Sequence, residues 1–166
     1  MAHPSTVSRN IDPTAWASAL DSNETTAKDD LGAIRTEYDD TYRRCEYRYV
    51  MNNSGTALVD GDSVVFNDSY ASKVTGTHTL RNKGAGVAFG AIAASSYGYI
   101  QITGYHDAVR GSTLGAIASG DRICLSASVG KVARSALGSA ATQQTYGFAL
   151  ADDNTTNVAC YLQFPR

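Results

Sequence analysis

Histidine and cysteine most often hold metals or act as nucleophiles, and this chain of 166 residues has three of each. The histidines are His3, His78 and His106, and no pair of them has the spacing of a metal-binding motif. An odd number of widely spaced cysteines favours small buried side chains in reduced surroundings over a disulfide framework. The cysteines are Cys45, Cys124 and Cys160.

Motifs of hydrolases and nucleotide-binding proteins are not found in the sequence. His106 and Asp107 are adjacent, so in an extended chain their side chains point to opposite faces and make a poor base–orienter pair. The sequence has no Gly-x-Ser-x-Gly elbow. The run from Gly84 to Gly90 resembles a dinucleotide-binding fingerprint, but it has one residue too many before the last glycine and no helical pattern after it.

Paired carboxylates occur at residues 29–30, 39–40 and 152–153, each time in a predicted turn. Aspartate is common in turns because its side chain bonds to the nearby backbone. Glycoside hydrolysis or calcium binding at residues 152–154 stays open as a second interpretation. We therefore predict that the protein is not an enzyme and needs no metal or other cofactor.

Composition narrows the class of partner. The formal net charge is −2, with no lysine-rich run, which argues against nucleic acid and anionic membranes as partners. No apolar run approaches the length of a membrane span. The N-terminus lacks the apolar core of a signal peptide, so we expect a protein made and used without secretion.

Two similar hairpins organise the predicted fold. Residues 84–104 form an apolar, glycine-punctuated run, a small-residue turn and an alternating strand, and residues 147–164 repeat this order. A Gly-Asp turn followed by a short strand precedes each hairpin, at residues 60–66 and 119–125. We align Tyr99-Ile100-Gln101-Ile102 with Tyr161-Leu162-Gln163-Phe164. The pattern predicts an all-β fold: one small β-sandwich or barrel-like domain of short hairpins with a weak two-fold internal repeat.

The N-terminal residues 1–30 differ from the rest, so we expect an arm, residues 1–30, and a β domain, residues 31–166. Asp12-Pro13 predicts the start of a short helix over residues 14–20, which makes the arm extended or partly helical. Two interpretations stay open. The arm is a frayed terminus with one aromatic against the core, or it docks on a neighbouring subunit with Trp16 and Leu20 as anchors.

Tyrosines supply the other candidate interface residues. In the strand predicted over residues 42–51, Tyr47 and Tyr49 share a face with Cys45, which favours core or subunit contact over a ligand platform. The opposite, charged face, with Glu46 and Arg48, is expected to be solvated. The predicted interface residues are Trp16, Leu20, Tyr47, Tyr49, Tyr97 and Tyr99.

The C-terminal half resembles a known family. Ala118 to Ser126, Gly130-Lys131-Val132, Tyr146 to Leu150 and the final strand to Phe164 are similar to the tailed-bacteriophage capsid cement, or decoration, proteins. Residues 31–36 and 97–101 are also similar to such phage head proteins, whereas residues 1–30 match nothing in them. The resemblance covers about two-thirds of the chain.

This resemblance implies a structural virion protein that binds the outer surface of the expanded capsid and stabilises it. The implied partner is the major capsid protein, the implied assembly a homotrimer, and the location the virion, after synthesis in the bacterial host cytoplasm. An alternative is a head-fibre or tail-associated adhesin for host glycans, with Tyr97, Tyr99 and Tyr105 as a platform. A glycan hydrolase is the third and least favoured hypothesis.

Overall fold

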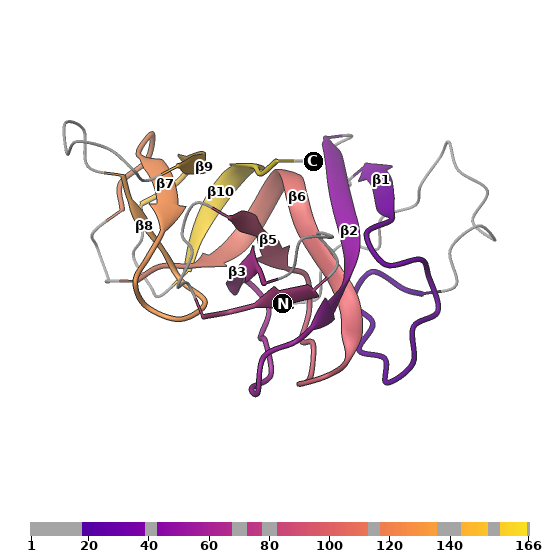
Figure 1. Ribbon diagram of the computed structural model, residues 1–166. Coiled ribbons are helices and arrows are strands. Elements are labelled where there is room, and N and C mark those ends of the chain that lie inside the picture. The colour runs from indigo at the N-terminus through magenta and orange to yellow at the C-terminus, as the bar shows by residue number, and fades with distance from the viewer. Residues whose placement is uncertain are drawn as a thin grey trace.

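A computed structural model describes residues 18–38, 43–67, 73–77, 83–112, 117–135, 144–152 and 157–165 (Figure 1). These residues form ten β-strands and no helix, which confirms the predicted all-β class. Among them no helix could cross a membrane. The strands are β1 (Ile34–Tyr38), β2 (Arg44–Asn52), β3 (Ser63–Phe66), β4 (Lys73–Thr75), β5 (Gly84–Ala88), β6 (Tyr97–Arg110), β7 (Arg122–Leu125), β8 (Val132–Arg134), β9 (Thr145–Ala149) and β10 (Asn157–Gln163).

All ten strands belong to one sheet with the order β1-β2-β4-β3-β5-β6-β10-β9-β7-β8. β2 also pairs with β6, so β2, β4, β3, β5 and β6 close into a ring. The ring depends on β6, a strand of 14 residues whose first half pairs with β2 and β5 and whose second half pairs with β10. Pairing with β10 extends this strand to Arg110, beyond the end of the predicted hairpin at residue 104.

The predicted internal repeat is present in the structure, where the same order of strand pairing occurs twice. The first half of the repeat has the order β4-β3-β5-β6, and the second half has the order β8-β7-β9-β10. In the second half, a parallel bridge between Val132 of β8 and Gly111, the residue after β6, brings β8 back to the end of β6. In the first half, the parallel pair β2–β4 plays the same part. Each half therefore wraps towards a closed ring, and β6 belongs to both.

The Gly-Asp turns are equivalent bond for bond. Asp62 Oδ2 accepts a hydrogen bond from the N–H of Val59 at 2.9 Å, and Asp121 Oδ2 accepts one from Ala118 at 2.9 Å. The backbone carbonyls of the same aspartates accept the N–H groups of Ala88 and Ala149, both at 2.8 Å. Each turn thus ties the start of one strand to the end of the next hairpin strand.

The structure shifts the alignment of the two halves by two residues in the returning strand. Val87 pairs with Gln101 in the first hairpin, and the equivalent Phe148 pairs with Tyr161 in the second. Gln101 is therefore the counterpart of Tyr161, whereas the sequence alignment had matched Tyr99 with it. A shift of two residues keeps every side chain on its own face of the strand, so the alternation pattern does not detect it.

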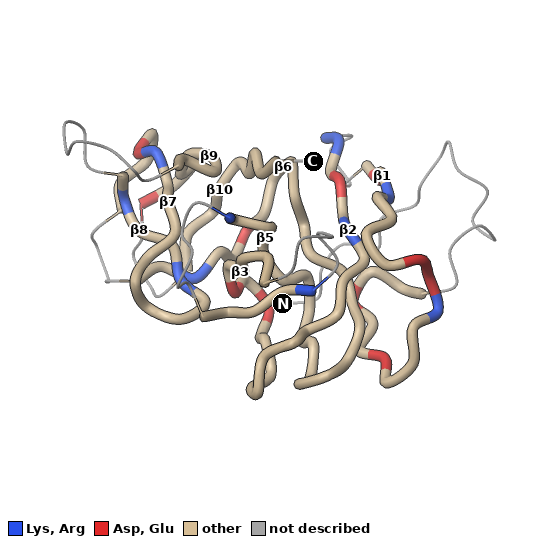
Figure 2. Tube along the Cα trace, in the orientation of Figure 1, with Lys and Arg blue, Asp and Glu red and all other residues tan. Residues whose placement is uncertain are grey.

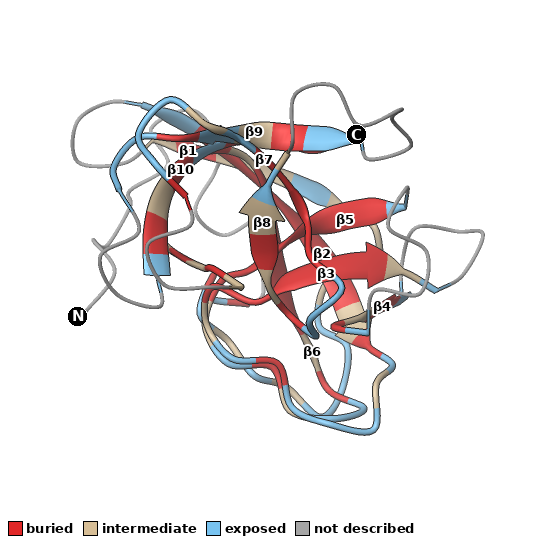
Figure 3. Cartoon of the chain, turned by 90° about the vertical axis from the view of Figure 1, so that its left-hand side faces the viewer, coloured by how far each residue is buried: buried red, intermediate tan, exposed pale blue. Residues whose placement is uncertain are grey.

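Buried residues lie mainly on the strands, as the red segments of Figure 3 show. Their apolar side chains form two clusters. The larger cluster takes side chains from both halves, among them Val64, Ile100, Ile123 and Leu162. Cys124 is buried too, and all three cysteines are buried thiols outside any disulfide, as expected. Because one cluster spans both halves, they form a single unit of packing.

The charged face of β2 is not solvated, which corrects the prediction. Glu46 is only 2% exposed and Arg48 only 5%. Arg44 pairs with Glu46 at 2.6 Å, and the guanidinium of Arg48 lies 5.2 Å from the ring centre of Phe66. The face of β2 that carries Arg48 also carries Val50, which belongs to the larger apolar cluster, so this face points into the ring. The strap packs on the opposite face, which carries Tyr49.

Residues 18–30, which we call the strap, are the described part of the predicted arm. The strap contains no helix, and of the helix predicted over residues 14–20 only 18–20 lie within the described residues. The strap pairs with β6 through a bridge between Glu24 and Tyr97. It thus packs on the sheet of its own chain, and the domain boundary at residue 30 stays a prediction.

Alanine at the two equivalent turn glycines is predicted to have unequal effects. Gly61 and Gly120 both have left-handed backbone, with φ of 82° and 86°. A Cβ at Gly61 would collide with the carbonyl oxygen of Ala108, whereas a Cβ at Gly120 meets open space. We expect Gly120→Ala to lower the free energy of unfolding by about 1–2 kcal/mol. Gly61→Ala should cost about 1–3 kcal/mol more, because the backbone has to move. Urea unfolding measures both, and equal losses would contradict the predicted collision.

Candidate functional site

Most of the predicted interface residues meet in one place. Tyr47, Tyr49, Tyr99 and Leu20 are buried in the smaller apolar cluster, and Tyr97 packs against it half-buried. Trp16 lies outside the described residues. Core packing accounts for the four buried side chains, and contact with another subunit stays a prediction for all six. The proposed adhesin platform is not an exposed surface, because Tyr99 is buried and Tyr97 and Tyr105 are half-buried.

The strap is held by a carboxylate that collects hydrogen bonds from three directions. Glu24 Oε2 accepts from the hydroxyls of Ser18 at 2.8 Å and Tyr49 at 2.9 Å. Glu24 Oε1 pairs with the ammonium of Lys28 at 2.9 Å. Burial acts to raise the pKa of Glu24, but these hydrogen bonds outweigh it and lower that pKa. Glu24 is therefore an anchor that works in its charged form.

A second tyrosine fastens the other end of the strap. Tyr99 donates a hydrogen bond from its hydroxyl to Asp29 at 2.8 Å, and the N–H of Ser18 donates to the same carboxylate oxygen. Burial, together with the nearby Asp29, raises the pKa of Tyr99 far above its ordinary value. The hydroxyl therefore stays protonated and remains a donor. The two buried tyrosines thus have apolar rings in the core and polar ends that bind the strap.

A different group of side chains lies on the outer face of the second half. Arg122, Phe148, Tyr161 and Tyr105 are directly opposite one another across β7, β9, β10 and β6. Phe148 and Tyr161 stack at 5.6 Å, and the guanidinium of Arg43 lies over Tyr105 at 3.7 Å from its ring centre. We call these five residues the aromatic row. Its rings are bounded by one arginine at each end.

Phe148 reaches this face because of a bulge at Gly147. Strict alternation from the buried Tyr146 would turn Phe148 inward, but β9 has one extra residue relative to β7 at this point. Gly147 takes φ of 144°, and a Cβ there would collide with the carbonyl oxygen of Tyr161. A glycine bulge of this kind redirects the next side chain. Phe148 is consequently 43% exposed.

The same row exists in the first half, where it is closed to solvent. Its members are Ser63, Val87, Gln101 and Tyr47, at the equivalent pairing positions on β3, β5, β6 and β2. All four are buried, none of them more than 2% exposed. At these positions the first half has buried side chains, whereas the second half has aromatic side chains that are exposed or half-buried.

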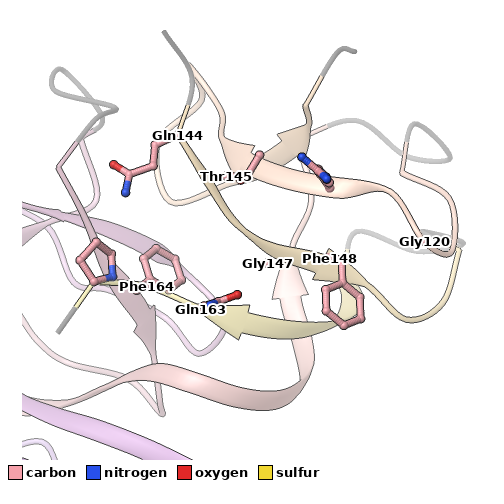
Figure 4. Close-up of a pocket in the computed structure, with 9 residues that line it drawn as sticks. Gly120, Gln144, Thr145, Gly147, Phe148, Gln163 and Phe164 are labelled. Atoms are coloured by element: carbon pink, nitrogen blue, oxygen red, sulfur yellow. The ribbon is translucent and has the colours of Figure 1, made fainter. Parts of the chain in front are cut away.

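A hollow of about 700 Å³ opens beside Phe148 (Figure 4). Its walls carry hydrogen-bonding groups from Arg122, Gln144, Thr145 and Gln163. Phe148 lies at the opposite end of the hollow from Gln144 (Figure 4). The volume lies within the range of sites for small organic ligands. Gly120, Gly147, Phe164 and Pro165 complete the wall.

The described residues show no catalytic or metal-binding group. No three His, Cys, Asp or Glu side chains among them come together as a metal site. His106 is buried, and its Nδ1 lies 3.9 Å from Asp107 with no serine placed beside it in the described contacts. Asp152 accepts a hydrogen bond from the N–H of Ser119 at 2.8 Å, which links it to the turn before β7. Residues 153–154 of the alternative calcium or hydrolase site lie outside the described residues.

Among the described residues, Lys and Arg are interspersed with Asp and Glu along the chain (Figure 2). Comparisons of the chain with models of protein families, with curated protein sequences and with solved structures find no match. The site is therefore judged on its own geometry.

Sequence reasoning missed the aromatic row. Arg122, Phe148 and Tyr161 are far apart in the chain, and their register becomes visible only when β7, β9 and β10 pair. One signal was available. A glycine directly before an aromatic residue inside a short strand, as in Gly147-Phe148, is typical of a bulge that turns the aromatic outward.

Acid is predicted to loosen the strap. The pKa of Glu24 is lower than its ordinary value of 4.5, so its charged form stabilises the fold above that pH. This contribution is lost as the pH falls below 4.5 and through the folded-state pKa. We expect hydrogen-exchange protection of the Tyr97 N–H, which donates to the Glu24 backbone carbonyl, to decrease over this interval. In Glu24→Gln this pH dependence should disappear. A variant that retains it would show that another group controls the strap.

Proposed function

We propose that this protein is a structural virion protein that binds the outer surface of an expanded phage capsid and stabilises it. The observation that carries the proposal is the correspondence between the resemblance and the repeat. The longest stretch similar to decoration proteins, from Ala118 to Phe164, spans β7 to β10, the second half of the repeat, and the similar residues 31–36 and 97–101 lie at β1 and at the start of β6. The first half, β3 to β6, has the same pairing order. The resemblance thus applies to the unit from which the fold is built.

The physical properties of the fold suit such a role. A protein that acts by staying attached requires a rigid body and complementary surfaces, and it requires no catalytic group. The ring and the shared strand supply rigidity, and the strap adds to it. A ligand that binds only one state of its target stabilises that state by mass action, so binding restricted to the expanded lattice would stabilise the expanded shell.

The contacts of the strap determine which deletion best tests the arm hypothesis. Residues 18–30 are bound to their own sheet through Glu24 and Asp29, so removing them would expose the polar ends of Tyr49 and Tyr99. A deletion of residues 1–30 would therefore combine two effects. The arm hypothesis is better tested on residues 1–17, which contain Trp16 and leave every described strap contact in place.

Deletion of residues 1–17 is predicted to weaken attachment to capsids and leave the β domain folded. The measurement is co-sedimentation with expanded heads of the phage that encodes the protein, alongside urea unfolding of the variant. Trp16→Ala should weaken attachment in the same direction, because buried aromatic anchors dominate many interfaces. Ala17→Ser, a small change at the neighbouring residue, is the matched control. Full attachment of the folded deletion variant would refute the arm as the attachment segment.

Light scattering of the intact protein tests the proposed assembly. We expect a mass of three chains over a range of concentrations. A single chain at every concentration, together with no co-sedimentation, would refute the decoration role.

A further inference from the structure

We propose that the aromatic row and its hollow form a binding site for an acidic oligosaccharide. This is an activity separate from capsid attachment and does not rest on it. In the bound state, one sugar ring would pack on Phe148 at the hollow with its carboxylate on Arg122, and hydroxyls along the oligosaccharide would bond to the side chains of Gln163 and Gln144.

The comparison between the two halves gives the first argument. The equivalent row in the first half consists of Ser63, Val87, Gln101 and Tyr47, and it is buried by the chain itself. In the second half, Phe148 and Tyr161 are 43% and 40% exposed, and Tyr105 beside them is half-buried under Arg43. Adjacent exposed aromatics are costly in water, and contiguous exposed apolar groups mark binding sites. The divergence of the two rows points to a ligand at the exposed one.

The chemistry of the walls indicates the class of ligand. A pyranose ring has an apolar face of C–H groups and a rim of hydroxyls, so it requires a flat apolar surface next to groups that both donate and accept hydrogen bonds. Phe148 provides the surface, and Tyr161 stacks on it with the two ring planes 17° apart. The amides of Gln144 and Gln163 each offer two donors and an acceptor. A carbohydrate would use both sets of groups at once.

The arginines give the preference for acidic sugars. Arg122 lines the hollow, and Arg43 lies at the far end of the row over Tyr105. A guanidinium binds a carboxylate with two parallel hydrogen bonds. The nearest carboxylate in sequence, Asp121, is engaged elsewhere, since it accepts the N–H of Ala118 and lies 3.9 Å from Arg134. A uronic acid residue of the ligand would supply the charge that complements Arg122.

The probes are a galacturonic acid hexamer and maltohexaose, which is neutral and of similar length. Each is titrated into the full-length protein by calorimetry. We expect the acidic hexamer to bind and maltohexaose to bind at least about ten times more weakly, since hydrogen bonds to charged groups contribute about 1.5–3 kcal/mol. Phe148→Ala should weaken both by about tenfold or more.

Two further variants separate the contributions. Arg122→Gln should remove the preference for the acidic hexamer while leaving the affinity for maltohexaose unchanged. Leu150→Ala is the matched control, because Leu150 is similarly exposed on the same hairpin, at 42%, but does not line the hollow. Its binding should equal that of the unchanged protein.

Three results would overturn the proposal: no binding of either hexamer, equal binding of both, or binding that Phe148→Ala leaves unchanged. The same variants are also assayed for solution mass and for co-sedimentation with capsids. If Phe148→Ala alters mass or attachment while neither hexamer binds, the row is a protein interface and the glycan site is refuted. Loss of glycan binding with normal attachment supports the proposal and leaves the decoration role intact.

Discussion

The structure depends on one strand that serves two rings. β6 pairs with β2 and β5 along its first half and with β10 along its second. Backbone N–H and C=O groups buried in a sheet need partners, and closing the sheet on a shared strand supplies them for both halves. Gly104 lies close to the backbone of β2 at the middle of this strand, where its φ of 101° and the carbonyl of Arg44 exclude a side chain. The two halves therefore meet along continuous backbone as well as through packed side chains.

Equivalent positions in the two halves have different neighbours, and this difference sets their chemistry. The first half is covered by β1 and the strap, so the tyrosines there have buried rings and bonded hydroxyls. At the corresponding positions of the second half, Phe148 and Tyr161 stack and are exposed to solvent. Strand pairing alone thus leaves open whether a side chain belongs to the core or to a surface. The segments laid over the sheet decide it.

The sequence predicted what alternation and turn chemistry encode. The hairpins, the Gly-Asp turns and the repeat follow from patterns within about ten residues, and the structure contains them all. Burial of Glu46 and Arg48 could not be foreseen, because it requires β2 to have neighbours on both edges and a covered second face. The aromatic row could not be foreseen either, because Arg122 and Tyr161 become neighbours only through the register of β9. The two-residue error in aligning the halves has the same origin, since a period of two is unchanged by it.

The position of the strap also bears on the order in which the segments of the chain fold. Tyr99 and Asp29, which fasten one end of it, are 70 residues apart in sequence. The strap is synthesised before the strand on which it lies. The surface that binds it therefore does not exist until β6 has left the ribosome and paired. Contacts of such long separation form late, because the loop between them must close first. The first described segment of the chain is thus among the last to find its place, and until then the hydroxyls of Tyr49 and Tyr99 are bonded to water.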